Sequence, residues 1–90
     1  MFTVAKPPQF IGTPTINPAS INATTVSDQT FTVKGLTPDM AVCLNWPGLT
    51  AGILIGNVEV SAANTLKIRF FNQTAGAVDI PATAIKVIAF

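Results

Sequence analysis

The sequence predicts an all-β domain, an antiparallel β-sandwich or small barrel, with an extended proline-rich arm at its N-terminal end. Apolar and polar side chains alternate with a period of two residues over several short stretches, as expected for strands with one buried face. Glycine, proline and asparagine separate these stretches, and helical periodicity is weak throughout. About six short strands joined by such turns are typical of sandwiches and small barrels.

Residues 1–18 differ in composition from the rest and predict an extended arm, which leaves residues 19–90 for the sandwich domain. Four prolines fix their own backbone and push the preceding residues toward extended conformations: Pro7, Pro8, Pro14 and Pro18. Apolar side chains lie among them, namely Phe2, Phe10, Ile11 and Ile16. A flexible tail would have little use for these side chains. Two interpretations are open: an arm that lies across another subunit, or a first strand that lies on its own domain.

The domain is expected to begin with a short strand over residues 21–26, followed by a polar turn at Ser27-Asp28-Gln29. Residues 30–34 then alternate regularly, with Phe31 and Val33 facing inward and the threonines and lysine facing outward.

Three further strands are expected over residues 40–46, 53–60 and 65–70. Gly56 interrupts the second of them, where a bulge or a close backbone contact is expected. Asn64 lies in the turn before the third and suits a left-handed conformation. The third strand has the clearest alternation, and its inward-facing residues are Leu66, Ile68 and Phe70.

The last expected strand, residues 84–90, is apolar on both faces. Ile85 and Val87 mark one face, and Ile88 and Phe90 mark the other. A strand of this kind would be buried on both sides, one of them by a neighbouring subunit.

The composition favours a protein that is buried in an assembly. Apolar residues make up 49% of the chain and charged residues only 10%, whereas soluble domains carry about a quarter charged residues. The net charge is +1 and the charged residues are scattered singly, so neither nucleic acid nor a membrane surface is an expected partner. The longest apolar stretch, residues 49–60, is broken by glycines and too short to span a bilayer, and no secretory signal is recognisable.

The chain lacks the side chains of most catalytic and metal sites, and no enzyme activity, cofactor or metal is expected. Histidine, the commonest general base and metal ligand, is absent. Cys43 is the only cysteine, and its apolar surroundings in the sequence predict a small buried hydrophobe. The four carboxylates have no ligand spacing. Two triplets of the glycosylation type, starting at Asn22 and Asn72, are attributed to chance in a chain so rich in asparagine and threonine.

Two aromatic residues stand out. Trp46 ends an inward-facing run beside Pro47 and is expected to close the core. Phe71 falls on the outward phase of its strand, where an exposed ring would serve as a subunit contact or as a platform for sugar stacking.

Residues 31–90 resemble a module of small virion proteins of tailed bacteriophages. The motifs that match, in the order found in that family, are Thr32 to Leu36 with Asp39, Pro47 to Gly52, Asn57 with Val60 to Thr65, and Phe70 to Val78 with Pro81-Ala82. They are turns and strand edges, so the resemblance implies architecture and no catalytic residue. Glu59 departs from the family pattern, which has a basic residue there. The resemblance implies a head decoration (cement) protein, a head fibre or a tail fibre.

Together these observations predict a non-enzymatic phage virion structural protein that decorates and stabilises the capsid shell. Its partners would be the major capsid protein or other virion subunits, and the resemblance implies a homo-oligomer, with a trimer favoured. The residues expected at interfaces are Phe2, Pro7, Pro8, Phe10, Ile11, Phe71 and Phe90. Deletion of residues 1–18 is expected to abolish particle binding and to leave the sheet folded. The alternative function is a tail or head fibre or adhesin module that contacts host-surface glycans through Phe71 and loop asparagines.

Overall fold

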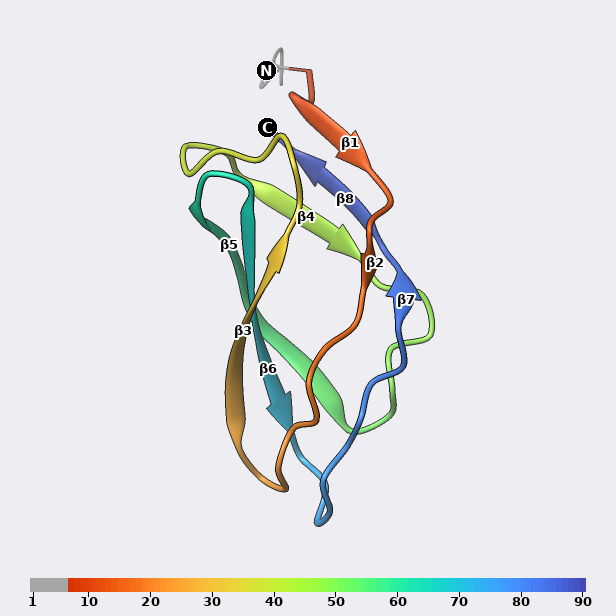
Figure 1. Ribbon diagram of the computed structural model, residues 1–90. Helices are drawn as coiled ribbons and strands as arrows, with labels where there is room; N and C mark the ends of the chain where they lie inside the picture. Colours follow the sequence, from red (N-terminus) through yellow and green to blue (C-terminus); the bar gives the residue numbers. More distant parts are fainter. Residues whose placement is uncertain (1–6) are drawn as a thin grey trace, which may run out of the picture.

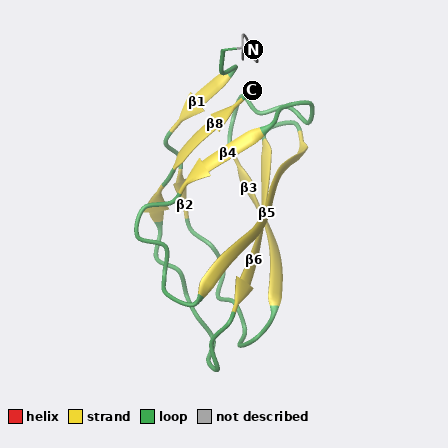
Figure 2. Ribbon diagram, turned by 180° about the vertical axis from the view of Figure 1, so that it is seen from behind, coloured by secondary structure: helices red, strands yellow, loops and turns green. Residues whose placement is uncertain are grey.

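The chain folds as antiparallel β-sheets, which confirms the predicted all-β class. The computed structural model describes residues 7–90, and this range contains no helix (Figures 1 and 2). The strands are β1 (Phe10–Gly12), β2 (Thr15–Ile16), β3 (Val26–Thr32), β4 (Val42–Asn45), β5 (Ile53–Ala62), β6 (Thr65–Asn72), β7 (Thr83–Ala84) and β8 (Lys86–Ala89).

Two layers enclose the core. One layer is the sheet β3-β6-β5, and the other is the sheet β1-β8-β4, extended by the pair β2-β7 (Figure 1). The pairings Phe10↔Ala89, Thr15↔Ala84 and Ile21↔Val78 share one register. The break between β1 and β2 includes Pro14, which has no amide hydrogen but whose carbonyl still accepts a bond from the Ile85 amide at 3.0 Å, and the break between β2 and the Ile21↔Val78 bridge includes Pro18. Residues 10–21 therefore run antiparallel to residues 78–89 as one interrupted ladder.

This ladder decides between the two interpretations of the N-terminal segment for the part that the structure describes. Residues 10–16 lie on their own domain as strands, and Ile16 and Pro18 are buried. Pro7 and Pro8 are exposed ahead of β1, and Phe2 lies outside the described residues. Deleting residues 1–18 would remove β1 and β2 with the arm, so that deletion is not a clean test of the arm.

The polar turn expected at Ser27-Asp28-Gln29 is wrong, because these residues form the middle of β3. They pair with β6 without any break in register. Asp28 faces outward beside Arg69, and the Gln29 side chain faces inward. Gln29 Nε2 donates to the Ala19 carbonyl at 3.0 Å, and Gln29 Oε1 accepts from the Ala19 amide at 2.8 Å. The polar side chains thus find partners across the sheet, which local sequence does not reveal.

The expectations for β5 and β6 are confirmed. The register of β5 against β6 shifts between Ile55 and Asn57, which places a bulge at Gly56. Asn64 adopts the left-handed conformation with φ of 60°, and its side-chain oxygen accepts from the Gly35 amide at 2.9 Å. The predicted inward-facing residues of β6 are fully buried: Leu66, Ile68 and Phe70.

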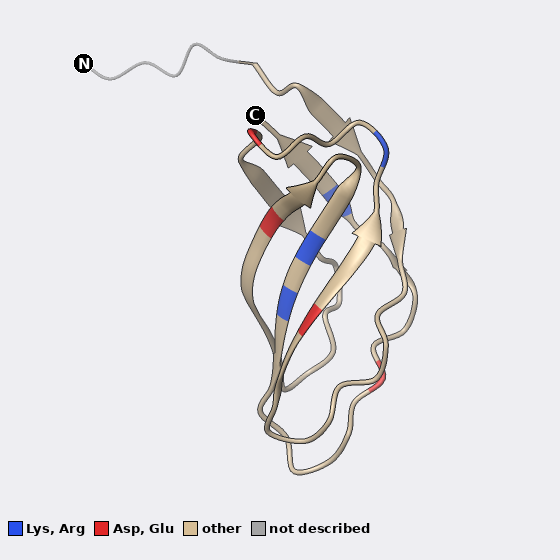
Figure 3. Cartoon of the chain, turned by 60° about the vertical axis from the view of Figure 1, so that its left-hand side comes forward, with Lys and Arg blue, Asp and Glu red and all other residues tan. Residues whose placement is uncertain are grey.

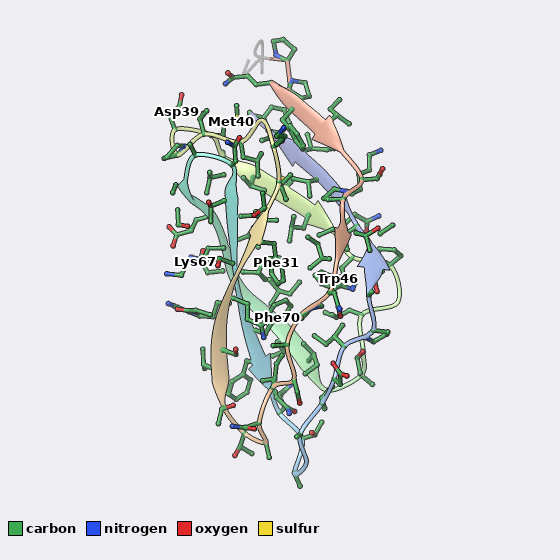
Figure 4. The ribbon with its side chains drawn as sticks, in the orientation of Figure 1. Phe31, Asp39, Met40, Trp46, Lys67 and Phe70 are labelled. Atoms are coloured by element: carbon green, nitrogen blue, oxygen red, sulfur yellow. The ribbon has the colours of Figure 1, made fainter. Side chains whose placement is uncertain are left out.

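Phe70 lies at the centre of the core. Trp46 packs edge-on against it with ring centroids 5.8 Å apart, and Phe31 does so at 6.5 Å (Figure 4). Both arrangements are the T-shaped geometry that aromatic quadrupoles favour. Trp46 is half-buried and packs against the core, as expected.

Asn72, at the end of β6, is the buried polar residue of the core and joins three segments. Its Nδ2 lies within hydrogen-bonding distance of the carbonyls of Ile21 (3.0 Å), Asn22 (3.2 Å) and Gly76 (2.9 Å). Its Oδ1 accepts from the amide of Thr74 at 2.8 Å and from the Thr74 hydroxyl at 2.7 Å. An amide nitrogen so placed is inaccessible in the folded protein, so the glycosylation-type triplet at Asn72 cannot act as an acceptor there.

Candidate interaction surfaces

The candidate site is a surface. Over residues 7–90 there is no pocket and no group of three or more potential metal ligands. None of the described segments is a helix long and apolar enough to cross a bilayer. The outer faces of the two layers are therefore the surfaces to consider, and each carries an apolar row that crosses all three strands.

The first surface lies on the outer side of β1-β8-β4, and we call it the β8 face. Ile11 and Cys43 flank Ile88 from the two neighbouring strands, because both are its direct cross-strand partners. Phe90 extends the row, since it exchanges backbone hydrogen bonds with Ala41 at 2.8 and 3.0 Å. Ile11 is 64% exposed, which makes it the most exposed large apolar side chain of the described residues. The β8 face thus carries a continuous apolar strip, which crosses β1, β8 and β4 near the first residues of β1.

Cys43 belongs to this strip, so its predicted burial is wrong. Val42 and Leu44 face the core, and Cys43 between them is exposed. The apolar run around it in the sequence reflects a strand that is apolar on both sides, and within residues 7–90 only one of these sides is covered.

Phe10 and Ile11 point to opposite sides of β1. Phe10 is half-buried and packs against the core, with its ring over Gly12 and Gly35. Lys86, which pairs with Asn45, is the charged residue at the far end of the β8 face. The face therefore offers apolar area with little charge.

The second surface is the outer side of β3-β6-β5, which we call the β6 face. Val26 and Leu54 flank Phe71 as its direct partners. Val26 is 57% exposed and Leu54 is 50% exposed, whereas Phe71 between them is half-buried. The ring of Phe71 is thus the middle of an apolar row and not an isolated platform.

Charged side chains occupy the rest of the β6 face. Figure 3 shows basic positions on the central strand flanked by acidic positions on both neighbours. Arg69 donates to both carboxylate oxygens of Asp28, at 2.7 and 3.1 Å, and Lys67 lies 3.8 Å from Asp28 and 3.7 Å from Glu59. The hydrogen bond from Arg69 lowers the pKa of Asp28 and raises that of Arg69 itself. Two charges of each sign balance one another, so this half of the face presents no net charge.

Some residues of these two apolar rows were expected from the sequence, and others were not. Of the expected interface residues, the structure places Ile11 and Phe90 on the β8 face and Phe71 on the β6 face, whereas Phe10 is half-buried and packs against the core. It adds Val26, Leu54 and Cys43 to the two rows, and it places Ile88, which was expected on the same strand face as Phe90, in the row of the β8 face. Their contribution depends on strand register, which the sequence does not contain.

No protein-family model matches the chain, and neither a curated protein nor a solved structure matches it.

Proposed function

We propose that this chain is a non-enzymatic structural protein of a phage virion, which binds capsid subunits through the β8 face and stabilises the shell. The observation that carries the proposal is an apolar strip on an otherwise nearly uncharged sheet face, in which the exposed Ile11 and Cys43 flank the half-buried Ile88 and the half-buried Phe90 extends the row. Exposed contiguous apolar surface on a small domain is typical of a protein contact. The motif resemblance to small virion proteins supports the choice of partner.

The energetics favour many copies. Fully covering one exposed isoleucine contributes about 1.5–3 kcal/mol, and association itself costs several times that amount. A single chain would therefore bind weakly through this strip. Repetition around a shell, together with contacts between neighbouring chains, raises the effective affinity without new contacts.

The glycan-binding alternative has less support. A sugar-stacking platform needs an accessible ring with free hydrogen-bonding groups beside it. Phe71 is half-buried between two aliphatic side chains, and the charged pair beside it on that face, Asp28 and Arg69, is already joined by hydrogen bonds.

The first experiment is quantitative mass spectrometry of gradient-purified particles from the source. Copies in the hundreds per particle are expected for a capsid decoration protein. A handful of copies would assign the chain to a fibre or a tail and would favour the alternative. Absence from the particle would refute both virion functions.

The second experiment tests the face. Ile11→Ser removes the most exposed apolar side chain of the β8 face, and Leu54→Ser is the matched control on the β6 face. Sedimentation of each purified variant with particles that lack the protein should reveal binding roughly tenfold weaker for Ile11→Ser, which corresponds to about 1.4 kcal/mol, and little change for Leu54→Ser. The opposite order would transfer the contact to the β6 face.

A further inference from the structure

The free edges of the two layers differ in how well they are protected against pairing with another chain. Edge strands are normally kept apart by shortness, bulges, lysine or proline. β1 has three residues and β4 has four, and β5 has two register shifts. β3 has seven residues in unbroken register and contains no lysine or proline. Its single charge, Asp28, is neutralised by Arg69. β3 is therefore the long edge of the described chain that lacks these protections.

The hydrogen-bonding pattern identifies which backbone groups lie on this edge. The Asn72 amide donates to the Thr25 carbonyl, and the Val33 amide donates to the Asn64 carbonyl. Between these points the register is continuous, so the odd-numbered residues of β3 bond to β6. The even-numbered residues direct their N–H and C=O groups away from the sheet, and these residues are Val26, Asp28, Thr30 and Thr32. Within residues 7–90, no backbone partner faces them.

We propose that β3 pairs antiparallel with β3 of a second copy, which joins the two three-stranded sheets into one six-stranded sheet. This pairing would form independently of any capsid partner. A twofold axis at Gln29 overlaps the whole strand and places Asp28 opposite Thr30 of the second copy. Each of the four outward residues then exchanges bonds with its partner, giving about eight new backbone hydrogen bonds.

The charges select this register over its neighbours. A shift of the axis to Asp28 would bring two carboxylates directly opposite each other, which is unfavourable. With the axis at Gln29, the central row reads Asn57, Arg69 and Asp28 of one copy, followed by Thr30, Lys67 and Glu59 of the other. No like charges are adjacent in that row. The tether between Gln29 and Ala19 uses the Gln29 side chain, so it leaves the outward backbone groups unoccupied.

The first test measures association of the purified full chain by sedimentation velocity over a range of concentrations. The wild type should form dimers. Thr30→Asp places carboxylates opposite Asp28 twice per dimer and should raise the dimer Kd on the order of tenfold, whereas Thr30→Lys should lower it. Within a single chain the two substitutions should have the opposite effects, because Thr30 lies opposite Lys67: an aspartate would be favourable there and a lysine unfavourable. Thermal unfolding of dilute monomer therefore separates an effect on folding from an effect on pairing.

The second test fixes the register. In a Cys43→Ser background, Gln29→Cys places two thiols face to face at the twofold axis, within the Cα separation that a disulfide allows. Ser27→Cys is the control, because its two copies would lie about 14 Å apart along the strands. Mild oxidation should link the Gln29→Cys chains and leave the Ser27→Cys chains separate. A wild type that stays monomeric, a trimer, or equal linking of both variants would overturn the proposal.

Discussion

Replacement of Asn72 by alanine should be among the most damaging single changes in this chain, although the residue has no part in either surface. The side chain is 0% exposed and connects the end of β6 with the loop at Ile21 and with the turn at Thr74 to Gly76. An amide has two hydrogens and two lone pairs, so it satisfies four hydrogen bonds at once. At about 1 kcal/mol each, their loss would cost about 4 kcal/mol.

Other partners reduce this cost slightly. The Ile21 carbonyl also accepts from Val78, and the Asn22 carbonyl also accepts from Thr25. The Thr74 amide, by contrast, is left without its acceptor. The net loss should therefore be about 3–4 kcal/mol, out of a total of 5–15 kcal/mol for a small domain. The melting temperature should fall by roughly 12–32 °C.

The assay is urea unfolding of wild type, Asn72→Ala and the exposed control Asn57→Ala, which should change stability by less than about 0.5 kcal/mol. Asn72→Asp tests the chemistry, since it keeps the shape but directs a carboxylate at three carbonyls. Thr74 can still donate to one oxygen of that carboxylate, but the other replaces Nδ2 and faces the three carbonyls; this repulsion and the burial together raise the folded-state pKa of the carboxyl above its unfolded value. Its penalty should therefore be largest at neutral pH and diminish as the carboxyl is protonated in acid. A loss below 1 kcal/mol for Asn72→Ala, or an Asn72→Asp penalty independent of pH, would refute the account.

Two further predictions concern the ion pair and a glycine. Because Arg69 lowers the folded-state pKa of Asp28, this carboxylate stabilises the fold above its unfolded pKa, and the contribution is lost as the pH falls through the lower folded value. Arg69→Gln should therefore flatten the acid limb of stability measured by urea unfolding from pH 7 downward; an unchanged slope would contradict this. Gly52→Ala should cost about 2–4 kcal/mol, because φ is +85° and the new methyl group would overlap the Thr74 side chain. Gly48→Ala, at φ of +64° with open space around it, should cost only about 1 kcal/mol in the same assay, and equal losses would be inconsistent with a clash.

Most strands could be predicted from the alternation of apolar and polar residues, whereas the features that depend on which strands pair could not. Leu66, Ile68 and Phe70 could be assigned to the core because alternation along one strand is a local property. Ser27-Asp28-Gln29 could not be assigned to a strand, because the partners that satisfy these polar side chains lie far away in sequence. The same limit applies to the surfaces: an exposed residue such as Ile11 joins a strip only through its register with β8.

Cys43 offers a way to follow the proposed contact without altering the β8 face. The thiol is exposed in the free chain and lies beside Ile88 in the middle of the strip. If capsid subunits cover this face, a maleimide should label Cys43 rapidly in the isolated protein and much more slowly in the particle, as read by intact mass.

The matched control is a Cys43→Ser, Leu54→Cys variant, which moves the thiol to the β6 face at a position that is 50% exposed. Labelling of this thiol should remain rapid on the particle. The β6 face carries two charges of each sign, so it is more favourably exposed to solvent than the β8 face. Protection of the Leu54→Cys thiol with continued labelling of Cys43 would mean that the chain binds by the opposite layer. Protection of both would mean that it is enclosed on two sides, which a surface decoration would not be.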